Sequence, residues 1–590
     1  MYSVRNLPLV VGLACPVLLS AMNFAQGSPP AAGQHAPATQ PAAPAPEVIF
    51  HTATRLVTIE VVARDHDRHP LTDLTKDDFH VFEQIAGKKE KNEQKIAVFR
   101  RVTISQPAAP HDDTVRVPPG VFTNLLTTQK DPFPPTVILI DGLNTEPAAQ
   151  LQVHAHMLKM LASIPQDVPA AVFLLGHNLT MVQNFTTDPK RLKQALQKAS
   201  GANSNGLAQM DPRDDPEALS AFVENIPSAS HILPAIQRFE RETYGSEMDL
   251  RVSKTLDALR SIARHIAGYP GRKNLLWVSS SFPIAISPDD DFDLDQMKNY
   301  APQMQEVAAA LGDANVAVYP IDPAGVQVSS VFSAGFNRRG DMGRAISRED
   351  LQRTSQQQSM KFLADQTGGQ VCVNNNDLGD CVKRAVDDGS SFYEIGYYPD
   401  ASAWNGEFHK ISIRTSQTAV RLTYRQGYYA RREGAGDQKK AKYEELQRAG
   451  CTDLLTATSI TMGARILSSD SPGTIKYVLV IDPNAVVATP TPQGDYHLAL
   501  QLGACTFDHA GKPLRFMQIP RDRTLTAAEY VSAHAENGLL DTLTLPQNTG
   551  ATEVRLVVKD TVTGRIGSLN IPFAQPGGAA ASAKTNLVPQ

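Results

Sequence analysis

Three aspartates, Asp289, Asp291 and Asp293, stand at alternate positions of one polar segment. Alternating carboxylates are typical of loops that bind Ca²⁺ through oxygen ligands. An EF-hand loop would also need Gly at its sixth position and Glu at its twelfth, where this sequence has Leu294 and Tyr300. The alternative is a solvated acidic loop whose charges favour the N-terminus of the next helix. Both interpretations stay open.

Four cysteines remain if the first, Cys15, is removed with a leader segment. An even number in an oxidising compartment predicts disulfides, and the pairing within domains is Cys372–Cys381 and Cys451–Cys505. The alternative is four free buried thiols. The spacings match no zinc motif, since no C-x-x-C or neighbouring histidine pair accompanies them.

The sequence contains no G-x-S-x-G, H-E-x-x-H, Walker A or G-x-G-x-x-G motif. His154 and His156 are two residues apart in an expected helix, so they face different sides and cannot chelate one ion together. His177 is expected at the surface of a loop. The sequence therefore predicts no catalytic residues and a protein that is not an enzyme.

The N-terminus has the features of a signal peptide: Arg5, an apolar run over Leu7–Leu19, and small residues leading to a cleavage site after Ala25. A membrane anchor is the alternative, but the run is short for a span of about 20 residues. Cys15 lies inside the run and Gly12 replaces a lipobox leucine, which disfavours a lipid anchor. No later segment reaches transmembrane length, so we expect a secreted or periplasmic protein without a stable span after cleavage.

The net charge of −5 over 590 residues, with both signs mixed, favours no nucleic acid or anionic membrane as partner. Apolar and charged residues make up 42% and 20% of the chain, which is ordinary for several globular domains.

Near-continuous apolar runs alternate with helical patterns in the middle of the chain, which predicts a doubly wound α/β domain. The expected strands are 136–141, 170–175, 180–185, 274–279, 315–322 and 368–373. Asp188-Pro189 opens one helix with an N-cap and a proline at its first position. A second helix is expected over Ser253–Ala267, whose apolar residues share one face, and a third near 296–311. Residues 200–250 are expected to be irregular.

Strand patterns without helices flank this region on both sides. Residues 57–64, 79–82 and 96–99 precede it, and 392–398, 410–414 and 420–424 follow it. Residues 431–450 are charged and helix-prone, and 451–573 have an all-β pattern. The sequence therefore predicts β-sandwich domains around the α/β domain.

Several motifs occur in an order that resembles bacterial secreted proteins related to the von Willebrand factor A domain. The resemblance covers residues 48–430. The motifs are LTDLTKDDFHVFE (71–83), IDGLNT (140–145), GRKNLLWVS (271–279), VAVYPID (316–322), GG (368–369), GYYP (396–399) and GYY (427–429).

With this resemblance the chain divides into seven expected parts. They are a signal peptide (1–25), a Pro/Ala-rich disordered spacer (26–46), a β domain in two halves (47–105 and 392–430), a von Willebrand A-like α/β domain (133–391), a helical connector (431–450), a C-terminal β-sandwich (451–573) and a disordered tail (574–590).

The resemblance implies a metal-ion-dependent adhesion site at the carboxyl end of the sheet, built from Asp141, Thr145, Ser253 and Ser280. The site is degenerate, because Leu143 replaces a hydroxyl residue and Ser280 stands where an acid is expected. No cofactor is certain, and a divalent cation such as Mg²⁺ or Ca²⁺ is the candidate. In the alternative, Asp141 caps backbone amides and the surface binds a partner without metal.

We also expect the side chain of Asn144 to point away from this site. The resemblance implies an exported, non-enzymatic binding or adhesion protein that recognises a protein or cell-surface ligand. A structural scaffold of the envelope and a cryptic hydrolase are the alternative functions.

Overall fold

The computed structural model describes most residues between 56 and 573, which belong to one compact unit over 54–590. The residues in this range that it does not describe are 86, 104–119, 125–134, 145–156, 161–162, 166–167, 207–222, 224–225, 227–230, 280–284, 287–297, 324, 326–341, 400–406, 431–437, 468–472 and 536–537. The predicted signal peptide, spacer and tail lie outside the described residues. So do Thr145, Ser280, Asp289, Asp291 and Asp293.

The fold is mixed α/β and rich in β-strands, and its middle is a five-stranded sheet in the order β12-β9-β6-β7-β8. Four strands are parallel and every one of their residues is buried, as their continuous apolar sequences predict. Strand β8 runs antiparallel at one edge. The bounds are β6 (Thr136–Asp141), β7 (Ala170–Leu175), β8 (Leu179–Thr186), β9 (Lys273–Val278) and β12 (Val316–Ile321).

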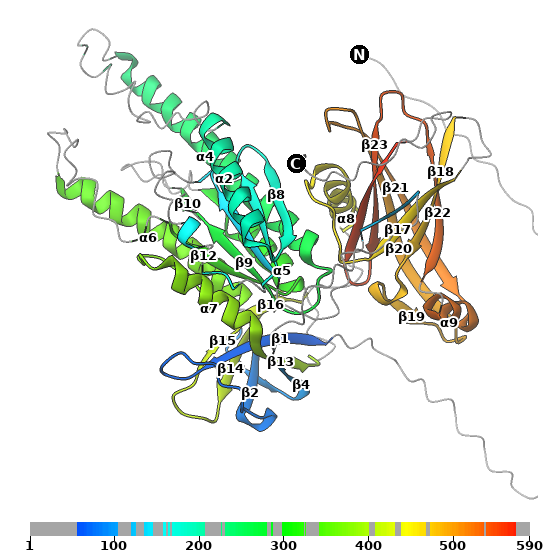
Figure 1. Cartoon of the computed structure of the whole chain (residues 1–590), viewed down its shortest axis with the longest axis horizontal. Coiled ribbons are helices and arrows are strands. Elements are labelled where there is room, and N and C mark those ends of the chain that lie inside the picture. The colour runs from blue at the N-terminus through cyan, green and yellow to red at the C-terminus, as the bar shows by residue number, and fades with distance from the viewer. Residues whose placement is uncertain are drawn as a thin grey trace, which may run out of the picture. The chain divides into compact units, whose positions relative to one another are not determined.

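Helices pack against this sheet (Figure 1), and two separate apolar clusters form, because alternate strand residues face opposite sides. Leu139 belongs to the cluster with helices α4 (Leu233–Ile266), α5 (Ala301–Asp313) and α6 (Met342–Thr367). Ile138 belongs to the cluster with α2 (Pro189–Gly206) and α7 (Leu378–Ser390).

Two sequence predictions fail in this region. Residues 233–250 were expected to be irregular, yet they form the first half of α4. This half carries exposed apolar residues such as Phe239, 63% exposed, so no buried stripe marked it as helical. The strand expected at 368–373 is reduced to an isolated bridge between Cys372 and Ile321. Gly369 lies so close to Val318 that a Cβ would be 1.9 Å from the Val318 carbonyl oxygen.

Two four-stranded antiparallel sheets combine segments from before and after the parallel sheet. Their orders are β15-β1-β13-β4 and β16-β14-β2-β3. Residues of β1 and β2 share one apolar core with residues of β13 and β14. The bounds are β1 (Val57–Arg64), β2 (Phe79–Ile85), β3 (Asn92–Gln94), β4 (Ile96–Thr103), β13 (Ser391–Tyr397), β14 (Phe408–Thr415), β15 (Arg421–Thr423) and β16 (Gly427–Tyr429).

A buried ionic cluster connects these antiparallel sheets to the parallel sheet. Asp388, in the last turn of α7, is fully buried, and one of its carboxylate oxygens accepts hydrogen bonds from Arg64 Nε at 2.9 Å and Nη2 at 2.6 Å. Its other oxygen accepts from the Tyr319 hydroxyl at 3.0 Å. Arg272 donates to the same hydroxyl at 3.0 Å and to the carbonyl of Gly368 at 2.6 Å. Strands β1 and β12 are thereby joined through one carboxylate.

The Asp388→Asn variant should therefore lose about 3–5 kcal/mol of unfolding free energy, because the buried Arg64 guanidinium is left without its counter-charge. Urea unfolding of the full chain measures this loss. The control is Asp365→Asn, whose pair with Lys361 on α6 is exposed and should contribute less than about 1 kcal/mol. Equal losses in the two variants would contradict the role assigned to Asp388.

The C-terminal region is a pair of antiparallel sheets packed on one core. One has the order β22-β18-β17-β5, and in the other β19, β21 and β23 pair with β20, while β24 pairs with β23. The bounds are β17 (Met462–Leu467), β18 (Thr474–Ile481), β19 (Ala488–Pro490), β20 (Tyr496–Phe507), β21 (Pro513–Leu525), β22 (Leu539–Pro546), β23 (Glu553–Asp560) and β24 (Ile566–Pro572). Helix α8 (Gln438–Gln447) precedes them, where a helical connector was predicted.

Helix α9 (Ala527–Ala535) interrupts the segment that was predicted to be all-β. The backbone N–H of Thr526 donates to Glu529 Oε2 at 2.9 Å, and the backbone N–H of Glu529 donates to Thr526 Oγ1 at 3.2 Å. This reciprocal pair is a capping box, and its Thr-x-x-Glu spacing was a readable signal for the helix.

One strand of the C-terminal sheet comes from far away in the chain. Strand β5 (Val121–Thr123) pairs with β17, although residues 106–132 were assigned to no domain. The buried Asn124 fixes it: its side chain donates to the carbonyls of Ala457 at 3.0 Å and Ile460 at 2.9 Å, and accepts from the N–H of Met462 at 2.7 Å. Three backbone groups of the C-terminal region therefore depend on one amide.

Replacing Asn124 by Ala should lower the unfolding free energy by about 1–3 kcal/mol, since buried backbone groups lose their partners. Thermal and urea unfolding of the full chain measure the effect. The exposed Asn484 provides the matched control, because Asn484→Ala should stay within about 0.5 kcal/mol of the wild type. A neutral Asn124→Ala variant would show that β5 is not held by this side chain.

Two further strands are short: β10 (Ala285–Ile286) pairs with β11 (Lys298–Asn299). Among the described residues, no helix is both long and apolar enough to cross a membrane.

Candidate functional site

Asp141 is the last residue of β6, at the carboxyl end of the parallel sheet. Strand β7 pairs on one side of β6 and β9 on the other, so the order of the strands reverses here. In open α/β sheets, ligands bind outside the carboxyl ends of the strands at such a reversal. The position of Asp141 therefore makes its surroundings the candidate site.

The carboxylate of Asp141 is fully buried and surrounded by hydrogen-bond donors. Its Oδ1 accepts from the backbone N–H of Asn144 at 3.0 Å. Its Oδ2 accepts from Asn144 Nδ2 at 2.7 Å, from Trp277 Nε1 at 3.1 Å and from Ser279 Oγ at 3.0 Å. Both oxygens are thus engaged by neutral donors from β9, from the residue after it, and from the loop after β6.

The prediction that Asn144 points away from the site is wrong. Its side-chain amide is buried and donates to both Asp141 and Thr255 Oγ1, the latter at 2.8 Å. Thr255 in turn donates to the carbonyl of Arg251 at 2.9 Å. The prediction came from the position of Asn144 within the expected metal-binding loop. In the structure this loop turns back on Asp141 through the backbone and side-chain amides of Asn144.

The structure brings Thr255, and not the predicted Ser253, to the cluster around Asp141. Ser253 is exposed on α4, whereas Thr255 is fully buried and reaches the cluster around Asp141. Two residues along a helix correspond to about 200°, so these side chains face opposite sides. Thr255 shares the buried face with Val252 and Leu259, and this helical spacing was the available signal.

Of the remaining predicted ligands, Thr145, Ser280 and the aspartates at 289, 291 and 293 lie outside the described residues. Ser279, the neighbour of Ser280, does contact Asp141. Among the residues that the structure describes, no group of three or more His, Cys, Asp or Glu side chains could hold a metal ion.

Burial raises the pKa of Asp141 above its ordinary value of 3.8, and the hydrogen bonds from Asn144, Ser279 and Trp277 oppose this shift in part. The neutral donors favour the ionised carboxylate without supplying a positive charge. The pKa is raised overall, so the loss of hydration has a larger effect on it than these hydrogen bonds.

Both predicted disulfides are present, Cys372–Cys381 and Cys451–Cys505. In the first, Cys372, which forms a β-bridge with Ile321 of β12, is linked to Cys381 of α7. In the second, Cys451, which follows α8, is linked to Cys505 of β20. The predicted pairing is confirmed.

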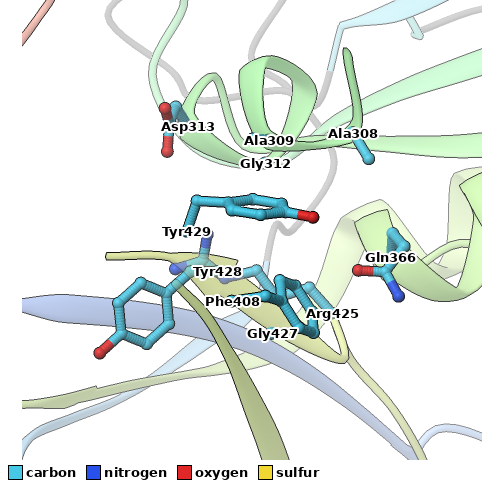
Figure 2. A pocket seen from close by; sticks show the side chains of 10 residues that line it. All are labelled: Ala308, Ala309, Gly312, Asp313, Gln366, Phe408, Arg425, Gly427, Tyr428 and Tyr429. Carbon is cyan, nitrogen blue, oxygen red and sulfur yellow. The ribbon is translucent and has the colours of Figure 1, made fainter. Parts of the chain in front are cut away.

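A shallow pocket lies elsewhere, between α5 and the strands β14 and β16. Figure 2 shows the α5 residues on one side of it and the aromatic rings of Phe408, Tyr428 and Tyr429 on the other. Arg425 also lines it, but its Nη2 donates to the carbonyl of Thr58 at 2.6 Å. The guanidinium of Arg425 is therefore already engaged in a contact within the fold.

No family model matches the sequence, and no curated protein matches it. Solved structures give distant matches. An aerotolerance-related membrane protein from Bacteroides fragilis is 9% identical with a TM-score of 0.24, covering 43% of this chain and 98% of its own. The conserved hypothetical protein BatB from Bacteroides thetaiotaomicron is 9% identical with a TM-score of 0.23, covering 43% and 97%.

The type V pili tip protein Mfa5 from Porphyromonas gingivalis, in a structure of three N-terminal domains, is 9% identical with a TM-score of 0.22. It covers 81% of this chain and 77% of its own. TM-scores this low carry no argument about the fold or the function of this chain.

The raised pKa of Asp141 predicts a specific pH dependence. The folded state keeps this proton to a higher pH than the unfolded state, so the contribution of Asp141 to stability falls as pH rises from about 4. The stability difference between wild type and Asp141→Asn should shrink toward pH 7, by about 1.4 kcal/mol per unit of pKa difference. Urea unfolding between pH 4 and 7 measures it.

The control has the opposite sign. Backbone hydrogen bonds from Lys512 and Ala510 lower the pKa of the exposed Asp508 below 3.8, so its contribution is lost only as pH falls below about 4. The difference between wild type and Asp508→Asn should therefore stay constant from pH 5 to 7. A difference for Asp141→Asn that grows with pH would contradict the raised pKa.

Proposed function

We propose that this chain is an exported, non-enzymatic binding or adhesion protein. It recognises a protein or cell-surface ligand through a von Willebrand A-like domain over 133–391 with a degenerate metal-ion-dependent adhesion site. The observation that carries the proposal is the position of Asp141, at the carboxyl end of β6 where the strand order reverses. The ordered motifs between residues 71 and 429 support the same assignment.

The two disulfides support an exported protein, secreted or periplasmic, because such bonds persist in oxidising compartments. The N-terminal signal-like segment supports the same localisation.

The hydrogen bonding at the sheet edge favours binding over hydrolysis. A nucleophilic serine donates its proton to a neighbouring base, usually histidine. Ser279 donates its proton to Asp141 Oδ2, and that oxygen also accepts two N–H hydrogen bonds. Ser279 is also fully buried, so its hydroxyl is not exposed to a substrate, and this supports a non-enzymatic role.

Exposed residues border the buried cluster and are available to a partner. His177 and Asn178 are exposed in the turn between β7 and β8, next to the end of β7 that pairs with Asp141, and helix α4 with Lys254 runs beside this turn. Lys254 Nζ donates to the carbonyl of His177 at 2.8 Å, which joins the two segments. The rim of the site is therefore polar and is formed by two connected elements.

The test is a solid-phase assay in which the full chain is offered a panel of immobilised extracellular proteins and surface glycans. We expect saturable binding to at least one member, weakened at least tenfold by Asn178→Arg, which places a bulky cation on the rim. The matched control is Gln194→Arg, which adds the same side chain to the exposed face of α2 and should leave binding unchanged. Equal binding by both variants, or none by the wild type, contradicts the proposal.

A structural scaffold of the envelope is the second candidate. The observation that favours it is the set of ion pairs between α4 and the segment before β17. Arg264 contacts Asp453 at 2.6 Å and Glu445 at 3.2 Å, and Glu445 also pairs with Lys559 of β23. Such contacts suit a spacer of fixed geometry. A panel with no saturable ligand would favour this role.

A further inference from the structure

We propose that the side-chain amide of Asn144 takes the place of the cation at this edge, so that the site recognises its partner without a divalent metal. The inference rests on the proposed function and adds that partner binding at this site does not depend on Mg²⁺, Mn²⁺ or Ca²⁺.

The geometry of Asn144 carries the first step. Its Nδ2 lies 2.7 Å from Asp141 Oδ2 and 2.8 Å from Thr255 Oγ1, between the two oxygens that a cation at this edge would share. An amide NH₂ has two hydrogens, and both are used here. The backbone N–H of Asn144 engages the other oxygen of Asp141 at 3.0 Å. One residue therefore supplies three donors to the oxygens of the site.

The remaining contacts of Asp141 oppose a cation in the same way. A hard cation needs oxygen ligands directed at it, and Mg²⁺ takes them at about 2.0–2.1 Å. Oδ2 instead faces the indole N–H of Trp277, a group that donates and cannot ligate a metal. Trp277 is fully buried within the apolar cluster against α4 and α5, so its ring is fixed by packing. A cation would face this N–H dipole at close range.

The charge of the cluster also disfavours a divalent cation. Of the five described side chains that these hydrogen bonds connect, only Asp141 is ionisable within the ordinary pH range; the others are Asn144, Thr255, Trp277 and Ser279. One carboxylate gives little compensation for dehydrating Mg²⁺, which gives up its water reluctantly. A partner at this edge therefore meets amide, hydroxyl and imidazole groups on the rim, rather than a metal that attracts a carboxylate.

The experiment is a Mn²⁺ titration of the full chain. Binding is measured by calorimetry and by the decrease of the electron paramagnetic resonance signal of free Mn²⁺. Only the binding that Asp141→Asn abolishes is counted, because other acidic segments of the chain can bind Mn²⁺. We expect the wild type to show no Mn²⁺ binding of this kind at Mn²⁺ concentrations up to about 1 mM, which is the dissociation constant of the weakest protein cation sites. Micromolar Mn²⁺ binding that disappears in Asp141→Asn overturns the proposal.

The converse variant is Asn144→Asp, which replaces the NH₂ group by an oxygen of nearly the same size and adds a second carboxylate. It should bind Mn²⁺ with a dissociation constant at least tenfold below the limit of about 1 mM expected for the wild type, and Mn²⁺ should raise its Tm. The double variant Asp141→Asn/Asn144→Asp should lose this gain, and Asn178→Asp, at an exposed asparagine of the rim, should not acquire it. A folded Asn144→Asp protein without any gain contradicts the proposal. If this variant does not fold, the wild-type titration decides.

The two proposals fail separately. Ligand binding in the solid-phase panel that is abolished by EDTA, and restored by Mg²⁺, overturns the metal-free inference while the binding function stands. An absence of any ligand overturns the binding function, and the Mn²⁺ titration still decides the state of the Asp141 cluster.

Discussion

The fold depends on one buried carboxylate, that of Asp388. It lies in the last turn of α7, three residues before β13 begins and the chain returns to the antiparallel sheets. Its partner Arg64 is 324 residues earlier, at the end of β1. A buried guanidinium without a counter-charge costs about 3–5 kcal/mol, so the contact between the two sheets at this point is strongly weakened when either partner is removed alone. The hydroxyl of Tyr319 completes the pair from β12.

Asp388 and Asp141 are both fully buried, but their surroundings differ. Asp388 is matched by a full positive charge, while the described partners of Asp141 are the neutral donors of Asn144, Trp277 and Ser279. A paired carboxylate holds elements together. A carboxylate surrounded by neutral donors keeps a pKa raised by burial, because no neighbouring positive charge offsets its loss of hydration.

The sequence predicted the fully buried strands well. The run Thr136–Asp141 is apolar up to its final acid, and its predicted bounds coincide with β6. Strand β9 differs from its prediction by one residue. Elements without a buried stripe were missed: the first half of α4 is largely exposed, and β5 has only three residues, too few for a periodic pattern. The disulfide pairs were predicted because each could close within one domain.

The sequence by itself determined that the parallel strands are buried on both faces and that Asp141 ends one of them, and it predicted which cysteines would pair if disulfides form. These properties depend on residue type and short-range spacing, which determine hydrophobic burial and loop closure. Only the tertiary structure decided that Asn144 closes on Asp141, that Thr255 rather than Ser253 joins them, and that Asn124 attaches β5 to a sheet more than 300 residues away. These contacts are hydrogen bonds between segments distant in sequence, and their partners are selected by geometry that no local pattern records.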